Sequence, residues 1–139
     1  MINKKIIFRA LGILLFIQGG FLLLCAAISF YYKEDDSIAF LCSIGATLSV
    51  AVLFYYRGRG AKRSINRRDG YVIVASAWII SSVIGMLPYL ISGYIEGVSD
   101  AFFEAISGFT STGATIVDRI ESFPHGLLFW RSITQWIGG

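Results

Sequence analysis

The sequence predicts an all-α integral membrane protein: two leading transmembrane helices, then a third helix, a re-entrant loop and part of a further helix. Three observations indicate this fold class. Of the 139 residues, 55% are hydrophobic and only 15% are charged, whereas soluble domains carry about 25% charged residues. Three long stretches contain no charge at all. After them comes a shorter apolar stretch, bounded by charges, that is too short to cross a bilayer.

The uncharged stretches cover residues 10–32, 37–56 and 70–95. A bilayer core about 30 Å thick needs roughly 20 helical residues, because each adds about 1.5 Å and lipid offers backbone amides no partner. Each stretch is therefore long enough to span the membrane. A cleaved signal peptide is the less favoured interpretation of the first stretch, because a signal core has roughly 7 to 15 residues and ends in a small-residue cleavage pattern.

The charges predict an orientation. Nine of the twelve basic residues precede the first stretch or separate the second from the third: Lys4, Lys5, Arg9, Arg57, Arg59, Lys62, Arg63, Arg67 and Arg68. Eight of the nine acidic residues fall on the other side of the spans. The positive-inside rule therefore predicts a multi-pass protein of the cytoplasmic (inner) membrane with a cytoplasmic N-terminus. The basic run is expected to meet the lipid bilayer and not nucleic acid, since no soluble module presents it.

Local signals around the third stretch predict where helices start and break. Asp69 is expected to cap its N-terminus, and Ser99 or Asp100 to cap the helix that follows. Pro88 lacks a backbone donor and crowds the preceding turn. A kink or a broken last turn is therefore expected between Gly85 and Pro88.

Several single residues receive structural interpretations. Cys25 and Cys42 lie in apolar runs and are expected to be small buried hydrophobes, not a disulfide or a metal site. Trp130 lies near a predicted span end and is expected to anchor at the membrane interface. Arg131 is expected to snorkel outward. His125 is expected to be solvated, and a buried structural role is slightly favoured for Glu104.

Residues 100–117 form the apolar stretch that cannot span. The first ten have helical spacing of their phenylalanines and reach about 15 Å. The next six are small and rich in hydroxyls, which weakens regular helix and permits an extended backbone: Thr110, Ser111, Thr112, Gly113, Ala114 and Thr115. Charges return at Asp118. The pattern predicts half a helix inward and an extended return, packed in protein or lining a water-filled path.

This arrangement suits a monovalent cation. The C-terminal end of the short helix carries its negative dipole end toward the membrane middle. An extended run then offers carbonyl and hydroxyl oxygens that can replace an ion's hydration shell and still release the ion. Calcium or magnesium fits less well, because no carboxylate lies between Ala105 and Val117. A monovalent cation at the six positions is the only metal expected, and no cofactor is expected.

The same residues are open to other interpretations. Residues 108–115 have phosphate-loop spacing, but Ala114 stands where that motif has its lysine. A membrane enzyme using Glu104, His125 or Asp118 would lack converging catalytic groups. A loop packed between helices without a transport role, in a non-conducting assembly or regulatory membrane subunit, remains the alternative.

Two runs, from Asp100 to Thr115 and from Phe129 to Gly139, resemble the Trk/Ktr/HKT superfamily of potassium uptake proteins, most closely the bacterial Trk-type membrane subunit. The resemblance extends weakly over the whole chain. It implies four potassium-channel-like repeats of helix, pore loop and helix around one ion path in a single chain. Residues 110–115 would then form the selectivity filter of the first repeat. Only one glycine, Gly113, is present where potassium channels usually have two, so tight selectivity is not implied.

The resemblance also implies a domain organisation and partners. Residues 1–69 are expected to form two N-terminal transmembrane helices and a basic cytoplasmic loop. Residues 70–139 are expected to form the first pore repeat, incomplete in its second helix, which starts at Pro124. The chain would thus be an N-terminal fragment, completed by three further repeats of a parent chain. Family members commonly work with a cytosolic nucleotide-binding regulatory ring.

Overall fold

The computed structural model describes residues 3–61 and 65–139, so Lys62 and Arg63 of the basic run lie outside the described residues. Its elements are α1 (Lys4–Tyr32), α2 (Ser37–Arg57), α3 (Arg67–Gly85), α4 (Leu87–Ser92), α5 (Val98–Phe109), the short 3-10 helix η1 (Ile120–Ser122) and α6 (His125–Gly138). These ranges contain no β-strand. The predicted all-α fold class is confirmed.

Three helical stretches are long and apolar enough to cross a membrane: Lys4–Tyr32, Ser37–Arg57 and Arg67–Ser92, with mean hydropathies of 2.4, 2.2 and 1.9. The first two are α1 and α2, and the third combines α3 with α4. They correspond to the three uncharged stretches of the sequence. α1 begins six residues before its uncharged stretch, so its first turns carry Lys4, Lys5 and Arg9.

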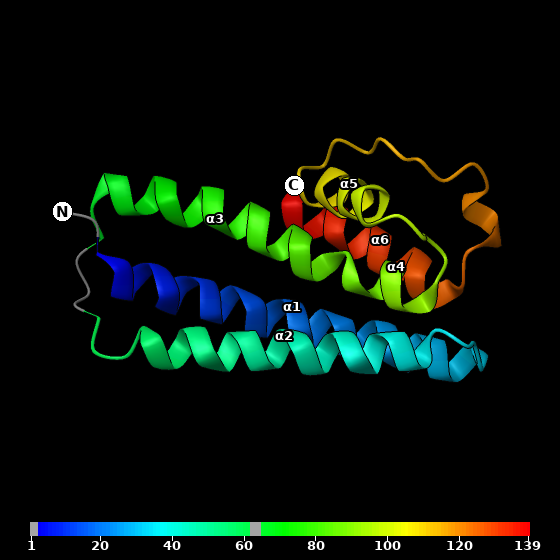
Figure 1. The fold of residues 1–139 in the computed structure, drawn as a ribbon, viewed down its shortest axis with the longest axis horizontal. Helices are drawn as coiled ribbons and strands as arrows, with labels where there is room; N and C mark the ends of the chain where they lie inside the picture. Colours follow the sequence, from blue (N-terminus) through cyan, green and yellow to red (C-terminus); the bar gives the residue numbers. More distant parts are fainter. Residues whose placement is uncertain (1–2, 62–64) are drawn as a thin grey trace.

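Helices α1 and α2 form an antiparallel hairpin (Figure 1). Small side chains repeat every four residues on the buried face of α2, at Ala39, Ser43, Thr47 and Ala51. Such residues let helix backbones approach closely, which is how helices associate in lipid. On α1, a Cβ at Gly12 would lie 2.8 Å from the backbone nitrogen of Tyr55. The close packing of the hairpin therefore depends on small residues on both helices.

The third span is broken where the sequence predicts a break. α3 ends at Gly85, and α4 starts at Leu87 with Pro88 in its first turn. Tyr89 donates its N–H to the Met86 carbonyl (3.1 Å), not to the carbonyl of Gly85. The indole Nε1 of Trp130 donates to that Gly85 carbonyl instead (3.0 Å). Trp130 is fully buried, so its predicted place at the membrane interface is wrong.

The helix starts differ from the sequence predictions. Asn66, not Asp69, is the N-cap of α3. Asp69 is buried at the third helical position, where its carboxylate accepts the N–H of Asn66 (3.3 Å) and that of Asn3 (2.9 Å). It therefore joins the N-terminal ends of α1 and α3. Gly97 is the N-cap of α5, so neither Ser99 nor Asp100 caps that helix.

Helices α5 and α6 lie along the half of the hairpin nearest to the α1–α2 turn (Figure 1). A single core joins them to α1, α2 and α4, and its fully buried members are Leu22, Cys25, Phe40, Tyr89, Ala101, Ala105, Leu127 and Trp130. Cys25 is buried as predicted, whereas Cys42 is exposed, contrary to the prediction. An apolar run in a membrane helix has an outer face as well as a packed one, and Cys42 lies on the outer face.

Candidate functional site

Helix α5 is fixed between α3 and α6 by close glycine contacts. A Cβ at Gly108 would overlap the Thr134 hydroxyl of α6, and one at Gly85 would lie 2.6 Å from the Phe109 ring. A Cβ at Gly138 would overlap the backbone of Phe109. The C-terminal end of α5 therefore has one defined position, with α6 on one side of it and the end of α3 on the other.

Residues 110–115, called segment 110–115 below, follow directly on α5. Thr110 and Ser111 form a turn, and Thr112 to Val117 have no regular secondary structure. The Ser107 carbonyl accepts the N–H groups of Thr112 (3.0 Å) and Gly113 (3.4 Å), which closes the end of the helix. Ser111 and Gly113 have φ values of 54° and 74°. Such left-handed conformations are freely open only to glycine, so Ser111 is held there by its surroundings.

Segment 110–115 then runs back along α5, as the chain trace shows (Figure 1). The Ser107 hydroxyl donates to the Ala114 carbonyl (2.6 Å). One turn earlier on the helix, Glu104 accepts from the Thr115 hydroxyl (2.9 Å) and from the Ile116 N–H (3.3 Å). Later residues of this stretch thus contact a residue one turn earlier on α5. A short helix and an irregular return lie side by side.

The segment is rich in oxygen atoms, and all six of its residues are exposed in this chain. Among the described residues, nothing donates a hydrogen bond to the carbonyl oxygens of Thr112 and Gly113. The hydroxyls of Thr110 and Thr112 are 2.8 Å apart. Ser111 turns the other way, because its hydroxyl donates to the Gln135 carbonyl of α6 (3.1 Å). The structure therefore brings the hydroxyls of Thr110 and Thr112 together and directs that of Ser111 toward α6.

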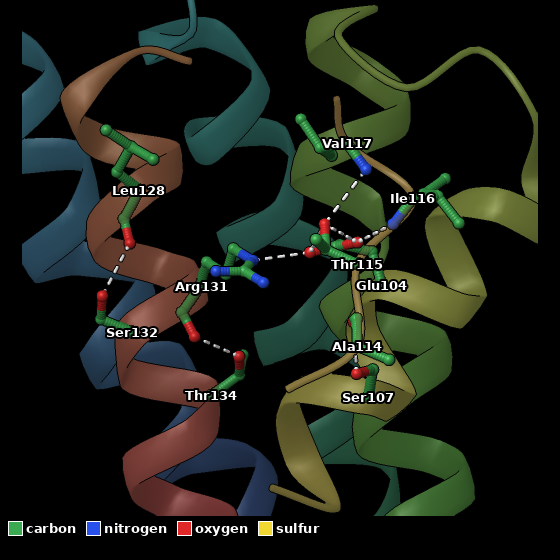
Figure 2. A network of polar contacts seen from close by, with 10 residues as sticks. All are labelled: Glu104, Ser107, Ala114, Thr115, Ile116, Val117, Leu128, Arg131, Ser132 and Thr134. Atoms are coloured by element: carbon green, nitrogen blue, oxygen red, sulfur yellow. Dashed lines mark hydrogen bonds and ion pairs between the residues drawn. The ribbon is translucent and has the colours of Figure 1, made fainter. Parts of the chain in front are cut away.

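An ion pair between α5 and α6 lies behind the segment (Figure 2). Arg131 donates its Nε–H to the carboxylate of Glu104 (2.6 Å). Glu104 is buried, as expected, and the prediction that Arg131 snorkels outward is wrong. The sequence did carry a signal for this pair. Charged side chains within apolar helices are usually paired when they are buried.

His125 lies at the other end of α6. Its side chain is 57% exposed, as expected, and it also has partners within the protein. Its Nδ1 is 2.7 Å from Glu34 Oε1, and its ring stacks on Tyr32 with centroids 4.0 Å apart. Glu34 also accepts the backbone N–H groups of His125 (2.9 Å) and Gly126 (3.3 Å). Partial burial alone would raise the pKa of Glu34, but these hydrogen bonds from His125 and Gly126 outweigh it and lower the pKa.

Three long apolar helices, and a short helix that ends in an irregular, oxygen-rich segment, define a membrane protein of the transport class. The cation transport protein family TrkH matches residues 37–139. The chain belongs to this TrkH cation transport family, and not to a family of enzymes.

The chain is similar to known proteins over nearly its whole length. It is 32% identical to the Trk system potassium uptake protein TrkH of Salmonella typhimurium, over 97% of the chain and 28% of that protein. It is 33% identical to the TrkH of Halomonas elongata, over 99% of the chain and 29% of that protein. The crystal structure of the potassium transporter TrkH from Vibrio parahaemolyticus matches with a TM-score of 0.90 and 32% identity, covering 99% of this chain and 30% of that one. The chain thus spans less than a third of the length of these relatives.

Proposed function

We propose that the protein containing this chain takes up potassium across the cytoplasmic membrane, and that segment 110–115 is one part of its selectivity filter. The observation that carries the proposal is the pair of carbonyl oxygens at Thr112 and Gly113, to which nothing in the described part of the chain donates a hydrogen bond. They lie at the end of a half-length helix, where Ser111 and Gly113 are left-handed. The relatives named as potassium uptake proteins support the choice of ion.

Carbonyl oxygens suit potassium because they replace water around the ion without a full negative charge, so that the ion can also leave. The hydroxyls of Thr110 and Thr112, 2.8 Å apart, add further hard oxygens to the same segment. One segment cannot surround an ion. We therefore propose that residues 70–139 form the first of four pore repeats, that residues 1–69 are leading helices outside the pore, and that three further repeats of a parent chain complete the filter.

The same topology gives the cytoplasmic side a partner surface. The first turns of α1, with Lys4, Lys5 and Arg9, lie at one end of the bundle together with the end of α2 and the start of α3, away from segment 110–115 (Figure 1). The described basic residues at that end also include Arg57, Arg59, Arg67 and Arg68. We place that end in the cytoplasm, because basic residues near spans are retained there. A cytosolic nucleotide-binding regulatory ring would approach this end, as the family resemblance implies.

The proposal is tested by replacing Gly113 with serine in the full-length parent protein. The backbone at Gly113 has φ 74°, and nothing lies within 4 Å of an added Cβ. The change therefore strains the backbone by about 1–3 kcal/mol without a clash. We expect correct insertion but a reduced preference for potassium over sodium, measured as rubidium uptake and its inhibition by sodium in cells that lack other potassium uptake.

Two matched controls separate the effect of backbone strain from the effect of the position within the proposed filter. Gly93→Ser places the same side chain at φ 76° with nothing within 4 Å, and Gly45→Ser places it in ordinary helix, also with nothing within 4 Å. Both variants should keep the ion preference of the native protein. An inserted Gly113→Ser protein with native preference would refute the filter assignment. No rubidium uptake by the native parent would favour the non-conducting subunit.

A further inference from the structure

We infer that Glu104 and Arg131 form a buried charge pair that positions segment 110–115 and thereby sets the ion preference of the pore. This inference rests on the proposed function. Neither residue is assigned a place in the ion path itself. Glu104 acts through Thr115 and Ile116, and Arg131 acts through Glu104.

Both side chains of the pair are largely removed from solvent. The side chain of Glu104 is 1% exposed and that of Arg131 is 17% exposed. Removing two charges from water is so unfavourable that apolar residues of the same volume usually stabilise a fold as well or better. Packing between α5 and α6 alone therefore gives no reason for charges here. The reason lies in what the second carboxylate oxygen contacts.

The carboxylate has more partners than any neutral side chain of its size could satisfy. Oε1 accepts from Arg131 (2.6 Å) and from the Thr115 hydroxyl (3.1 Å). Oε2 accepts from the same hydroxyl (2.9 Å) and from the Ile116 N–H (3.3 Å). Three donors converge on Glu104 (Figure 2). An ionised carboxylate is an acceptor at both oxygens, whereas an amide would turn one donor group toward these donors.

The contacts made by Ser107 and Glu104 fall on consecutive residues of the chain. Ser107 holds the Ala114 carbonyl, and Glu104 holds the next two residues, Thr115 and Ile116. The Thr115 hydroxyl also accepts the Val117 N–H (3.1 Å). The backbone directly after Gly113 is thus fixed to α5 at successive residues. Within residues 3–61 and 65–139 nothing donates to the carbonyls of Thr112 and Gly113, so their direction is determined by these fixed neighbours.

Arg131 has a separate task. Without it, an unpaired negative charge would lie behind the segment and attract cations of any kind. With it, the charges cancel, and the carboxylate of Glu104 accepts its three donors beside a counter-charge. Selectivity by the geometry of neutral oxygens requires that no net charge acts close by. Both members of the pair are therefore needed for ion preference, for different reasons.

The test compares Glu104→Gln, Arg131→Gln and the double variant in the full-length parent, with rubidium uptake, its inhibition by sodium and the amount of inserted protein measured together. Loss of a charged hydrogen-bond partner should reduce the preference for potassium over sodium about tenfold or more in each single variant. The double variant should be less impaired than the product of the two, because it buries no unpaired charge. Glu121→Gln, at an exposed carboxylate of η1, is the matched control and should retain the native preference.

The outcomes separate this inference from the proposed function. If the native parent shows no potassium-selective uptake, the proposed function fails. If it does, and Glu104→Gln changes only the amount of inserted protein, Glu104 is merely structural and the inference is overturned. Should Glu104→Gln not insert at all, Arg131→Lys and Arg131→Gln decide, since lysine keeps the charge. Lysine should retain most of the preference that glutamine loses, and equal preferences in the two would overturn the inference.

Discussion

At the scale of single residues, Trp130 compensates for a defect in the backbone. The break before Pro88 leaves the Gly85 carbonyl without its usual helical donor, inside a region shielded from water. A buried carbonyl without a partner is strongly unfavourable. The indole of Trp130 supplies the missing donor from α6. One hydrogen bond thus ties the broken span to the helix that packs behind α5.

Trp130→Phe tests this compensation. Phenylalanine fills most of the same volume but has no N–H, so the Gly85 carbonyl becomes unpaired. We expect a loss of about 1–3 kcal/mol in the free energy of unfolding, measured by denaturation of the purified full-length protein. Trp136→Phe is the control, because Trp136 is 74% exposed and its replacement should stay within about 0.5 kcal/mol. Equal effects of the two substitutions would contradict the compensating role.

Sequence patterns predicted the environment of residues whose partners are close in the sequence. They missed residues whose partners are many positions away. The turn around Gly113 follows from six neighbouring residues, and its positive φ agrees with the need for a glycine. The ion pair of Arg131 joins positions 27 apart, and no periodicity within either helix encodes it. The same holds for Trp130, whose acceptor lies 45 positions earlier. Such partners follow from how helices pack, which the pattern within each helix leaves open.

At the scale of elements, the α1–α2 turn caps a helix that begins far away in the chain. The first N–H groups of a helix have no partner within it, and a negative charge there also meets the positive end of the helix dipole. Glu34 supplies both to α6 through the N–H groups of His125 and Gly126. The hairpin thereby fixes the start of α6, while the glycine contacts of α5 fix its far end.

Glu34→Gln is expected to destabilise the protein by about 0.5–2 kcal/mol at pH 7, the range found for lost N-caps. The effect should depend on pH in one direction. Since the folded protein lowers the pKa of Glu34 below its ordinary value of 4.5, its contribution is present above pH 4.5 and is lost as the pH falls through the lowered pKa. Unfolding measured at pH 7 and at pH 3 should therefore show a difference between native and variant protein that shrinks at pH 3. Asp35→Asn, at the exposed neighbour, should show no such change, and a pH-independent Glu34 effect would refute the capping role.

Element boundaries follow from the sequence only where the signal is local. The three spans and the break at Pro88 depend on apolar length and on one proline, and both were predicted. The start of α3 was misplaced by three residues, because Asp69 accepts the N–H of Asn66 from within the first turn. Its second partner, Asn3, lies 66 positions earlier. A carboxylate near a helix start predicts that a start is near, and packing decides its position in the turn.

At the scale of the whole molecule, the third span is the least covered. Only 17% of the residues in its most apolar window are buried, against 44% for α1. Large side chains such as Tyr71, Val74 and Trp78 are exposed on α3. A bilayer and a neighbouring repeat both cover such a face with apolar atoms, so hydropathy alone does not distinguish them. The relatives are more than three times as long as this chain.

The helix bundle is expected to lie in the membrane with its basic end in the cytoplasm. Contact of Asn3 with Asp69, and of Gly58 with Arg9, gathers the basic segments at one end, whereas Glu34 and His125 meet at the other. Basic residues near spans are retained in the cytoplasm. In a full-length protein with Cys25 and Cys42 replaced by serine, a cysteine at Arg59 should react with an impermeant thiol reagent only from the cytoplasmic side.

A cysteine at Asp118 or Asp35 should react from the external side in the same experiment. Asp118 follows segment 110–115, so its external position would mean that the segment returns to the face from which α5 enters. Asp35, in the turn that contacts α6 through Glu34, is the independent control for that face. The reverse labelling pattern would mean that α5 and segment 110–115 enter from the cytoplasmic face. The proposed uptake filter would then fail, because external potassium would meet the basic end of the bundle first.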